Sequence, residues 1–320
     1  MRILYIVNML HSPFINDQID SIEKFGHHVT ILNIQGDESR LNYFKAPLRL
    51  RKLIRAKKVD LIHGHYSYSG CIAIVQRTLP VIVSFMGSDL NGSFKANGTN
   101  TIRGFIDIWL SRFLQLFVNG IIVKSKEMQQ LLIRKEKSIV LPNGVDFEIF
   151  KPMNRDDCLE KLGLNKTKKY VLFIGNPNLP GKAYATATKA IKILSSEYDN
   201  VELLEVYKVP HKDIPYYMNA ANVLILPSIK EGSPNVVKEA MACNLPIVAT
   251  EVGDVKEVID GVEGCAIVNR DPPSFASAIE NILDFTDRTG GRDHIGYLRM
   301  EKIADRLVGF YEKILSTASR

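Results

Sequence analysis

Two glutamates lie close together in the C-terminal half of the chain and could bind hydroxyl groups. They are Glu231 and Glu239, the first and last residues of the segment EGSPNVVKE, which follows the apolar run VLILP. A carboxylate can accept hydrogen bonds from two neighbouring hydroxyls, as the acidic residue of dinucleotide sites does with a ribose. One glutamate could therefore hold a ribose and the other a sugar, although either residue taken alone is more often a solvated surface glutamate.

The residues between these glutamates indicate the start of a helix. Ser233 suits the N-cap position and Pro234 the first helical position, for local steric and hydrogen-bonding reasons. The free N–H groups at such a start point toward the ends of the strands, and the helix dipole adds positive potential there. The segment therefore predicts a site for a phosphate or a polar sugar edge.

A lysine on a second loop could complete this site. The segment GNPNLPGK, from Gly175 to Lys182, follows the apolar run YVLFI and precedes a helical pattern. Its glycines and prolines favour a turn. Lys182 would supply a point charge suited to a diphosphate, and the alternative is a solvated lysine on an ordinary strand-to-helix loop.

Short apolar runs and segments with helical spacing alternate along both halves of the chain. This alternation predicts parallel sheets with helices on both faces. In the N-terminal half we expect strands at Ile3–Val7, Val29–Leu32, Val59–Ile62, Val81–Phe85, Ile121–Val123 and Ile139–Leu141, and helices at Ile15–Phe25, Leu48–Ala56 and Glu127–Leu132. In the C-terminal half we expect strands at Tyr170–Ile174, Val201–Val206, Val223–Leu226, Ile247–Ala249 and Ala266–Val268, and helices at Tyr184–Leu194, Ile214–Ala220, Val236–Ala242 and Phe275–Leu283.

The expected fold class is α/β, with two Rossmann-like, doubly wound parallel-sheet domains that face a cleft. The length of 320 residues suits two domains of ordinary size. The polar stretch Phe150–Lys169 is the expected boundary, which gives domains 1–152 and 153–302. A last helical pattern covers Tyr297–Ile314, and ligands of such sheets bind outside the carboxyl ends of the strands.

The composition is that of a globular protein with a full core. Apolar residues make up 46% and charged residues 24%, and no apolar run approaches the length of a membrane span. Four scattered cysteines show no metal spacing and suit a reducing cytoplasm, so we expect a cytoplasmic protein. The N-terminal run MRILYIV is interpreted as a buried strand, and not as a signal peptide.

The net charge of +6 suits phosphate esters, nucleic acid or an anionic membrane, and we expect no nucleic-acid partner. The segment Lys45–Lys58 carries seven basic residues and no acid, and Leu50, Leu53 and Ile54 form an apolar edge at helical spacing. A basic amphipathic helix of this kind binds anionic membranes, which would place the protein on the inner face of the membrane. The alternative is a helix packed on its sheet with a solvated basic face.

Two histidines, His63 and His65, lie at the end of an expected strand in the segment IHGHYSYSG. They could line the acceptor side of the cleft. A metal site would need further ligands that the sequence does not identify, so we expect none.

At these segments the sequence resembles glycosyltransferase family 4, whose members have the GT-B fold. The spacing of Glu231 and Glu239 matches the family's Glu-x7-Glu element, and EAMACNLPIVATEVGDVKEVI continues the match. The segments PNGVD, DIPYYMNAANVLILPS and QIDSIEKFGHHVTIL also resemble the family. The likeness covers nearly the whole chain and is more specific in the C-terminal half.

The resemblance implies transfer from a nucleoside-diphosphate sugar to a saccharide or lipid-linked acceptor in polysaccharide or glycolipid synthesis, with retention and without a metal or other cofactor. It implies that Glu239 binds the ribose, Glu231 the donor sugar and Lys182 the diphosphate. A last helix, about 303–320, would return to the N-terminal domain. Further donor-binding residues would be Gly175, Asn178, Val209, Gly232, Ser233, Pro234 and Asn235. The acceptor side would include Pro13, Phe14, His65, Met86 and Gly87, with Asp89 as a catalytic residue.

Three positions depart from the family pattern. No arginine stands between Gly175 and Lys182, Met86 replaces a frequent histidine, and the segment Met9–Phe14 lacks the usual glycines. These departures make a non-catalytic nucleotide-sugar-binding relative or assembly partner the alternative function. A sugar-nucleotide epimerase or phosphorylase fits the Glu-x7-Glu spacing poorly. A nicotinamide dehydrogenase is weaker still, because no glycine occurs before Gly26.

Overall fold

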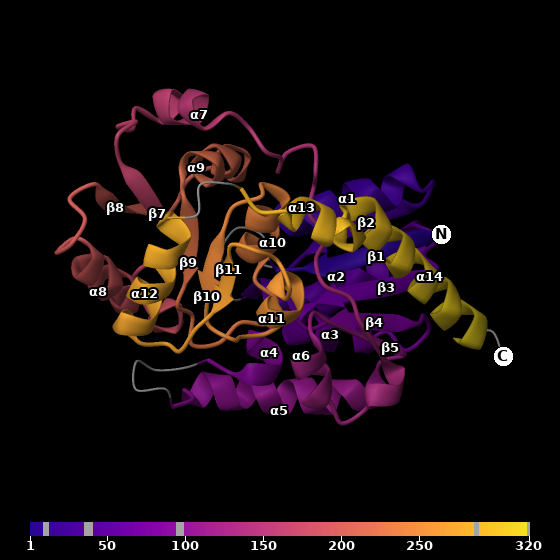
Figure 1. Cartoon of the computed structure of the whole chain (residues 1–320). Coiled ribbons are helices and arrows are strands. Elements are labelled where there is room, and N and C mark those ends of the chain that lie inside the picture. The colour runs from indigo at the N-terminus through magenta and orange to yellow at the C-terminus, as the bar shows by residue number, and fades with distance from the viewer. Residues whose placement is uncertain (9–12, 35–40, 94–98, 285–287, 319–320) are drawn as a thin grey trace. The chain divides into compact units, whose positions relative to one another are not determined.

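The computed structural model describes residues 1–8, 13–34, 41–93, 99–284 and 288–318 of the chain (Figure 1). Contacts between residues divide the chain into two compact units. The first unit comprises Met1–Gly144 and Met300–Arg320, and the second comprises Val145–Arg299. Each unit is built on one parallel sheet.

The first unit holds a six-stranded sheet in the order β2-β1-β3-β4-β5-β6, and each neighbouring pair is parallel. Its strands are β1 (Arg2–Val7), β2 (His28–Asn33), β3 (Leu61–His65), β4 (Val81–Ser84), β5 (Gly120–Val123) and β6 (Ser138–Val140). Its helices are α1 (Pro13–Lys24), α2 (Leu41–Ala56), α3 (Tyr66–Ile74), α4 (Ser88–Asn91), α5 (Ile102–Phe117), α6 (Lys126–Gln130) and α14 (Met300–Ala318), with a 3-10 turn at Lys135–Lys137.

Helices cover both faces of this first sheet. Buried side chains of α2, α3, α5 and α6 pack with alternate strand residues such as Leu4 and Ile6 on one face. On the other face the Tyr5 hydroxyl bonds to Gln18 of α1 and Tyr311 of α14. Figure 1 shows α14, in yellow, beside α1, in indigo, and the two helices are in contact. The last helix of the chain is therefore an integral layer of the first unit.

The second unit holds a five-stranded parallel sheet in the order β11-β10-β9-β7-β8. Its strands are β7 (Lys169–Ile174), β8 (Val201–Val206), β9 (Val223–Leu226), β10 (Ile247–Ala249) and β11 (Cys265–Ile267). Its helices are α7 (Arg155–Leu162), α8 (Tyr184–Leu194), α9 (Ile214–Ala220), α10 (Asn235–Ala242), α11 (Val255–Ile259), α12 (Pro272–Leu283) and α13 (Gly291–His294). Short 3-10 turns lie at Pro180–Lys182, His211–Asp213 and Gly296–Leu298.

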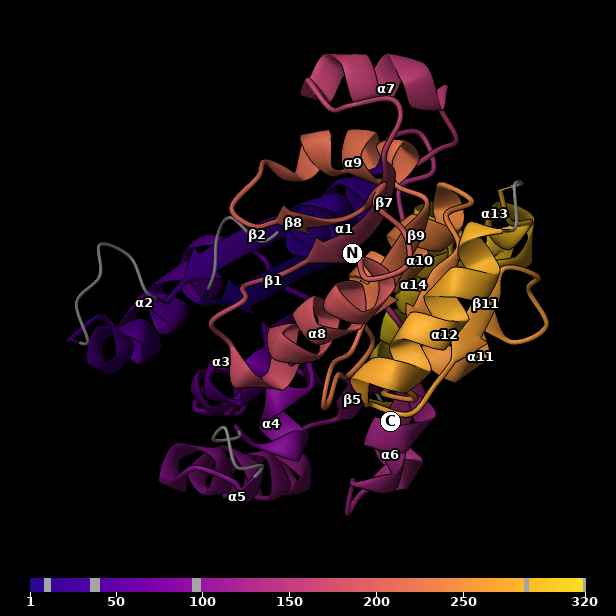
Figure 2. The ribbon, with the colours of Figure 1, turned by 60° about the vertical axis from the view of Figure 1, so that its left-hand side comes forward.

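The core of the second unit is formed on one face by α8 and α12, which lie side by side (Figure 2). Both helices place small or apolar residues such as Ala187, Ile191 and Phe275 against Val171 and Phe173 of β7. Alternate residues of β7 point to opposite faces of the sheet, which explains why its central stretch YVLF is apolar throughout. The predicted class of two doubly wound α/β domains is confirmed.

The structure contains helices that the hydrophobic pattern did not indicate. Helix α7 lies in the polar stretch expected to be a linker. Its start is capped by the Asn154 side chain, which accepts from the Asp157 N–H, and it ends at Gly163 in a left-handed conformation. Helices α3 and α5 were also not predicted, because neither carries its apolar residues on the buried side alone.

One arginine helps to hold the segment that follows Gly144 in the second unit. Nη1 of Arg292 donates to the carbonyl oxygens of Phe150 at 2.6 Å and Ala242 at 3.0 Å, and Nη2 donates to that of Phe147 at 2.9 Å. The guanidinium also lies 4.4 Å from the centre of the Phe147 ring. Residues 145–152 are thus grouped with the second unit, whereas the sequence analysis assigned them to the first.

Replacing Arg292 with Met should destabilise the second unit, because three carbonyl groups lose a charged donor. We expect a loss of about 1–3 kcal/mol in the free energy of unfolding, measured by urea denaturation. Lys256→Met, at an exposed surface position, is the control and should change stability little. Equal stability of the two variants would show that Arg292 does not hold this segment.

Candidate active site

The order of the strands in the second unit brings two loops to the same edge of the sheet. The chain passes from β7 to β8 on one side and then crosses back to β9 on the other side of β7. Ligands of doubly wound sheets bind at the carboxyl ends of the strands where such a reversal occurs. The loops that leave β7 and β9 there cover residues 175–183 and 227–234. They carry Lys182 and Glu231.

Lys182 and Glu231 form an ion pair at this edge. The distance from Lys182 Nζ to Glu231 Oε1 is 2.7 Å, and the two side chains are 26% and 18% exposed. The Ser228 hydroxyl donates to the same carboxylate oxygen at 2.8 Å. The structure thus brings together a cation and a carboxylate that lie far apart in the sequence, and both remain accessible enough to exchange partners with a ligand.

The backbone holds these two loops against each other. The N–H of Ile229 donates to the Gly181 carbonyl at 2.8 Å, which joins the β9 loop to the β7 loop. Gly175, directly after β7, has φ of 149°, which side-chain-bearing residues rarely adopt. The aliphatic stem of Lys182 lies at van der Waals distance from the place where a Cβ on Gly175 would be. The turn therefore sets the position of the lysine stem.

Glu239 has a histidine partner that the sequence did not reveal. His211 Nε2 lies 2.9 Å from Glu239 Oε1, and the Glu239 side chain is 12% exposed. The His211 ring also lies 5.1 Å from the Phe150 ring. Sequence analysis found no signal in His211. The sequence did offer one indication, because His211 lies two residues after Val209 in the loop that follows β8. Strand β8 lies beside β7, so its loop reaches the same edge of the sheet.

Ser233 is not the N-cap of α10, contrary to the prediction. The helix begins at Asn235 with Pro234 as its N-cap residue, and Pro234 has no side chain that could bond to the helix N–H groups. The Ser233 hydroxyl instead donates to Asp254 Oδ2 at 2.6 Å and accepts from Lys238 Nζ. Two buried charged groups compete for this hydroxyl more strongly than the helix start does.

Lys238 and Asp254 form a buried charged cluster with Ser233 of the loop that leaves β9. Lys238 is fully buried, Asp254 is 4% exposed, and Lys238 Nζ lies 3.6 Å from Asp254 Oδ2. Burial lowers the pKa of Lys238, and the nearby Asp254 carboxylate offsets part of that effect. The cluster connects α10 to the loop after β10 and restrains the segment between Glu231 and Asn235.

Close backbone packing reinforces this connection. Gly253, with φ of 59°, lies against the β9 loop, and a Cβ there would sit 2.6 Å from the Gly232 carbonyl oxygen. Only glycine permits this approach without moving one of the loops. The loops that follow β9 and β10 are therefore in close backbone contact at Glu231 and Gly232.

The other residues expected to bind the donor lie on the loops that follow β7, β8 and β9, and at the start of α10. Gly232 and Pro234 are buried, Asn235 is the first residue of α10, and Val209 is half-buried after β8. Asn178 is exposed, and its N–H donates to the Asn176 side chain at 3.0 Å. The arrangement offers two carboxylates, an ammonium and an imidazole, which can bind hydroxyls and an anionic group.

In the first unit, the Asp89 carboxylate connects the turn after β4 to the start of α3. Its Oδ1 accepts from the N–H of Ser67 at 2.8 Å and from the Ser67 hydroxyl at 3.0 Å, and its Oδ2 accepts from the Met86 N–H at 2.9 Å. The Asp89 side chain is 5% exposed. Burial raises the pKa of its carboxyl group, and the hydrogen bonds from Met86 and Ser67 offset part of that effect. These contacts favour a role for Asp89 in holding the loop, whereas the sequence analysis expected a catalytic one.

Met86 and Gly87 form the turn that Asp89 holds. Met86 is half-buried, and Gly87 is buried with φ of 129° immediately before α4. Phe14 lies in the first turn of α1 and is half-buried. Pro13 begins α1, but its side chain lies outside the described part of the structure, as do residues 9–12 of the segment Met9–Phe14.

His63 and His65 are interior residues of the first unit. The rings stack with their centres 4.3 Å apart, and His63 bonds to the hydroxyls of Tyr311 and Ser84 at 2.6 and 2.8 Å. His65 is 1% exposed, and neither ring nitrogen has a protein partner among the described residues. Burial lowers the pKa of His65 to about 3, so the ring is neutral. This burial differs from the expected exposure of His65 on an acceptor surface.

The apolar edge of the basic segment faces the protein core, contrary to the membrane-helix interpretation. Leu50 is fully buried, and Leu53 and Ile54 pack against the same core cluster. Among residues 45–56 of α2, the basic residues, Leu48 and Ala56 are exposed. The alternative of a helix packed on its sheet with a solvated basic face is therefore correct for this edge.

None of the helices that the structure describes combines the length and apolar character that a membrane span needs. The described residues contain no group of three or more His, Cys, Asp and Glu side chains that could hold a metal ion.

Both halves of the chain match models of glycosyltransferases. Residues 10–149 match the model described as Glycosyltransferase Family 4, and residues 164–284 match the model described as Glycosyl transferases group 1. The two matched regions follow the two units of the fold. The chain therefore belongs to glycosyltransferase family 4 and is a glycosyltransferase with the GT-B type of fold.

Curated relatives and solved structures agree with this assignment. The chain is 26% identical over 298 residues to the UDP-Gal:alpha-D-GlcNAc-diphosphoundecaprenol alpha-1,3-galactosyltransferase of Escherichia coli, covering 83% of this chain and 76% of that protein. Sucrose-phosphate synthase of Thermosynechococcus elongatus has a similar fold, with a TM-score of 0.82 at 19% identity over 99% of this chain and 100% of that one. HepE of Anabaena, solved with UDP-glucose, has a TM-score of 0.68 at 18% identity over 100% and 99%.

Replacing Lys238 with Met should destabilise the second unit strongly, because the buried Asp254 carboxylate would lose its cation. Breaking a buried pair in this way costs about 3–5 kcal/mol, measured here by urea unfolding. The double variant Lys238→Met with Asp254→Asn should recover part of the loss, since it removes the uncompensated charge. A double variant no more stable than Lys238→Met alone would contradict the pairing.

The neutral His65 predicts a stability that falls in acid. Its folded pKa of about 3 lies below the ordinary 6.5, so the unfolded chain binds the extra proton between these values. Its contribution is complete above pH 6.5 and declines by about 1.4 kcal/mol per pH unit below it. His65→Leu should flatten the decline in melting temperature from pH 7 to pH 5. The exposed His28→Leu is the control, and an unchanged slope in His65→Leu would contradict the burial.

Proposed function

We propose that this glycosyltransferase transfers a sugar from a nucleoside-diphosphate donor to a saccharide or lipid-linked acceptor with retention of anomeric configuration. The observation that carries the proposal is the pairing of Lys182 with Glu231 where the strand order of the second sheet reverses. An ammonium at that edge suits a diphosphate, and carboxylates beside it suit hydroxyls. Support comes from HepE of Anabaena, a protein of similar fold that was solved with UDP-glucose.

The proposed donor complex assigns one role to each side chain. Lys182 would turn from Glu231 to the diphosphate, and Glu231, still bonded to Ser228, would accept from hydroxyls of the donor sugar. Glu239 would hold the ribose while His211 keeps its carboxylate oriented. The N–H groups at the start of α10 would add donors for the phosphate. The buried cluster of Ser233, Lys238 and Asp254 would keep these donors in place.

The proposed reaction breaks the bond between the anomeric carbon and the diphosphate oxygen and forms a bond to the acceptor oxygen. The nucleoside diphosphate leaves with the bonding electron pair, and the acceptor hydroxyl loses its proton to that leaving group or to water. Lys182 and the N–H groups would stabilise the growing negative charge without a metal. Glu231 would stabilise the oxocarbenium character of the sugar ring.

A lipid-linked acceptor is supported by the Escherichia coli relative, whose name specifies a diphosphoundecaprenol acceptor. A second relative, 25% identical over 69% of this chain and 60% of its own length, is a putative teichuronic acid biosynthesis glycosyltransferase of Bacillus subtilis. We therefore propose a role in cell-surface polysaccharide or glycolipid synthesis, in the cytoplasm and in peripheral contact with the membrane. The non-catalytic alternative rests on Met86 and on the absence of arginine between Gly175 and Lys182.

Donor binding should depend on the paired side chains. In thermal shift measurements with UDP-, GDP- and ADP-sugars, one donor should raise the melting temperature of the wild type. Lys182→Ala and Glu239→Gln should each weaken that donor about 10-fold or more, because each loses a charged contact worth about 1.4 kcal/mol or more. The controls are Lys189→Ala and Glu251→Gln, at exposed positions of the same unit.

Product analysis by mass spectrometry, with membrane extract as the acceptor source, separates the two functions. A glycosylated product with the stabilising donor supports transfer, and stabilisation without turnover on any acceptor supports the binding relative. Unchanged donor affinity in both site variants would refute the site assignment.

A further inference from the structure

Helix α5 of the first unit exposes apolar residues and buries polar ones. Its buried positions are mostly small or polar and include Gly104, Asp107, Ser111 and Gln115. Trp109 is 71% exposed and Ile102 is 81% exposed. The large exposed side chains recur at helical spacing, so they form one continuous stripe, the α5 face: Ile102, Phe105, Ile106, Trp109, Phe113 and Phe117. A patch of this kind marks an interaction surface.

Polar contacts hold the buried side of α5, so the exposed stripe is not needed to anchor the helix. Gln115 Oε1 accepts from the N–H groups of Ile133 and Arg134 at 2.9 and 3.3 Å. At the other end the Thr101 side chain caps the helix by accepting from the Gly104 N–H at 3.0 Å. Leu114 alone reaches deep into the core between these ends. The α5 face can therefore serve another surface without loss of the helix.

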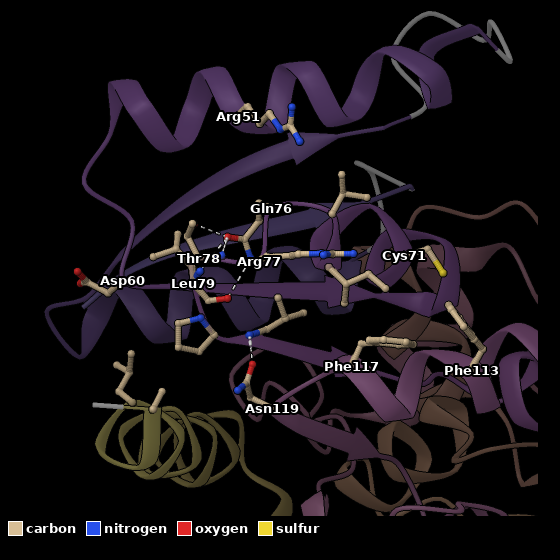
Figure 3. A pocket seen from close by; sticks show the side chains of 16 residues that line it. Arg51, Asp60, Cys71, Gln76, Arg77, Thr78, Leu79, Phe113, Phe117 and Asn119 are labelled. Atoms are coloured by element: carbon tan, nitrogen blue, oxygen red, sulfur yellow. Dashed lines mark hydrogen bonds between the residues drawn. The ribbon is translucent and has the colours of Figure 1, made fainter. Parts of the chain in front are cut away.

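Basic side chains border the α5 face. Arg103 and Arg112 are exposed on α5 itself, and the only acid of the helix, Asp107, is buried. At the end of the helix Phe113 and Phe117 line a cavity of about 1340 Å³ together with Arg51 of α2 and Arg77 (Figure 3). Asp60 also lines this cavity, but its carboxylate is paired with Arg2 at 3.0 Å.

We propose that the α5 face and its basic border dock the first unit onto an anionic lipid bilayer. Tryptophan and phenylalanine favour the interface between lipid headgroups and acyl chains, and arginines beside them attract anionic headgroups. Arg51 and Arg77 would meet headgroup phosphates at the mouth of the cavity.

The sign of the charge favours a bilayer over a second protein as the occupant of this surface. An apolar protein partner would need only the apolar stripe, whereas the combination of aromatic residues with an arginine border matches a negatively charged membrane surface. This inference rests on the proposed peripheral contact with the membrane and names the surface that makes it, and it is independent of the transfer reaction because docking requires neither a donor nor an acceptor.

The only tryptophan of the chain, Trp109, reports directly on docking. With vesicles that contain about one third phosphatidylglycerol, its emission should shift to shorter wavelength, and brominated lipid should quench it. Phosphatidylcholine vesicles should produce neither change, and high salt should weaken the effect. Unchanged Trp109 emission with anionic vesicles at low salt would overturn the proposal.

Co-sedimentation with the same vesicles tests the residues. Phe105→Ser and Trp109→Ser should each weaken binding to the anionic vesicles about 10-fold, and Arg51→Gln with Arg77→Gln should weaken it as well. Ile193→Ser is the matched control, since Ile193 is 40% exposed on α8 of the second unit. Equal binding by the Ile193→Ser and Trp109→Ser variants would contradict the assignment to α5.

Two further measurements separate this proposal from its alternatives. If light scattering shows a dimer that Ile106→Ser dissociates, and vesicles do not compete with it, the α5 face is an interface between copies of this chain and the proposal fails. Donor-induced thermal stabilisation should be unchanged in the α5 variants. Loss of vesicle binding with intact donor binding would therefore support docking whether or not the transfer reaction is correct.

Discussion

The reversal of strand order beside β7 is the constraint on which the candidate site depends. Because β8 and β9 lie on opposite sides of β7, the loops that leave these three strands reach the same edge of the sheet. Lys182, His211 and Glu231 come from those loops, and Glu239 from the helix that follows the last of them. The parallel sheet thus determines which side chains can meet, and local contacts determine how closely they do so.

The second unit contains two lysine–carboxylate pairs, one partly exposed and one buried. Lys182 and Glu231 are partly exposed, so a ligand can replace one partner with little desolvation. Lys238 and Asp254 are buried, so separating them costs far more. The shallow pair suits ligand exchange and the deep pair suits permanent positioning of the loop. This division supports the different roles that we propose for the two lysine–carboxylate pairs.

The two helices that flank α3 show that an apolar pattern does not by itself identify the exposed surface. Helix α2 has a basic sequence with an apolar edge, and that edge packs into the core. Helix α5 is rich in large apolar residues, and the largest of them are exposed because small and polar residues occupy most of its inner side. Arg51 of α2 and the aromatic residues Phe113 and Phe117 of α5 line the same cavity (Figure 3).

The sequence by itself determined the class of the fold and most strands of both sheets, and it indicated Lys182, Glu231 and Glu239 as candidate site residues. Short buried strands and glutamate spacing are local features, so they can be recognised from neighbouring residues alone. Tertiary structure decided the partners, because hydrogen bonds between loops depend on strand order. It paired His211 with Glu239, gave Ser233 to Asp254 and Lys238, and buried His65. Which side of α2 and of α5 faces the core depended equally on packing against the sheet, which a helical repeat in the sequence does not encode.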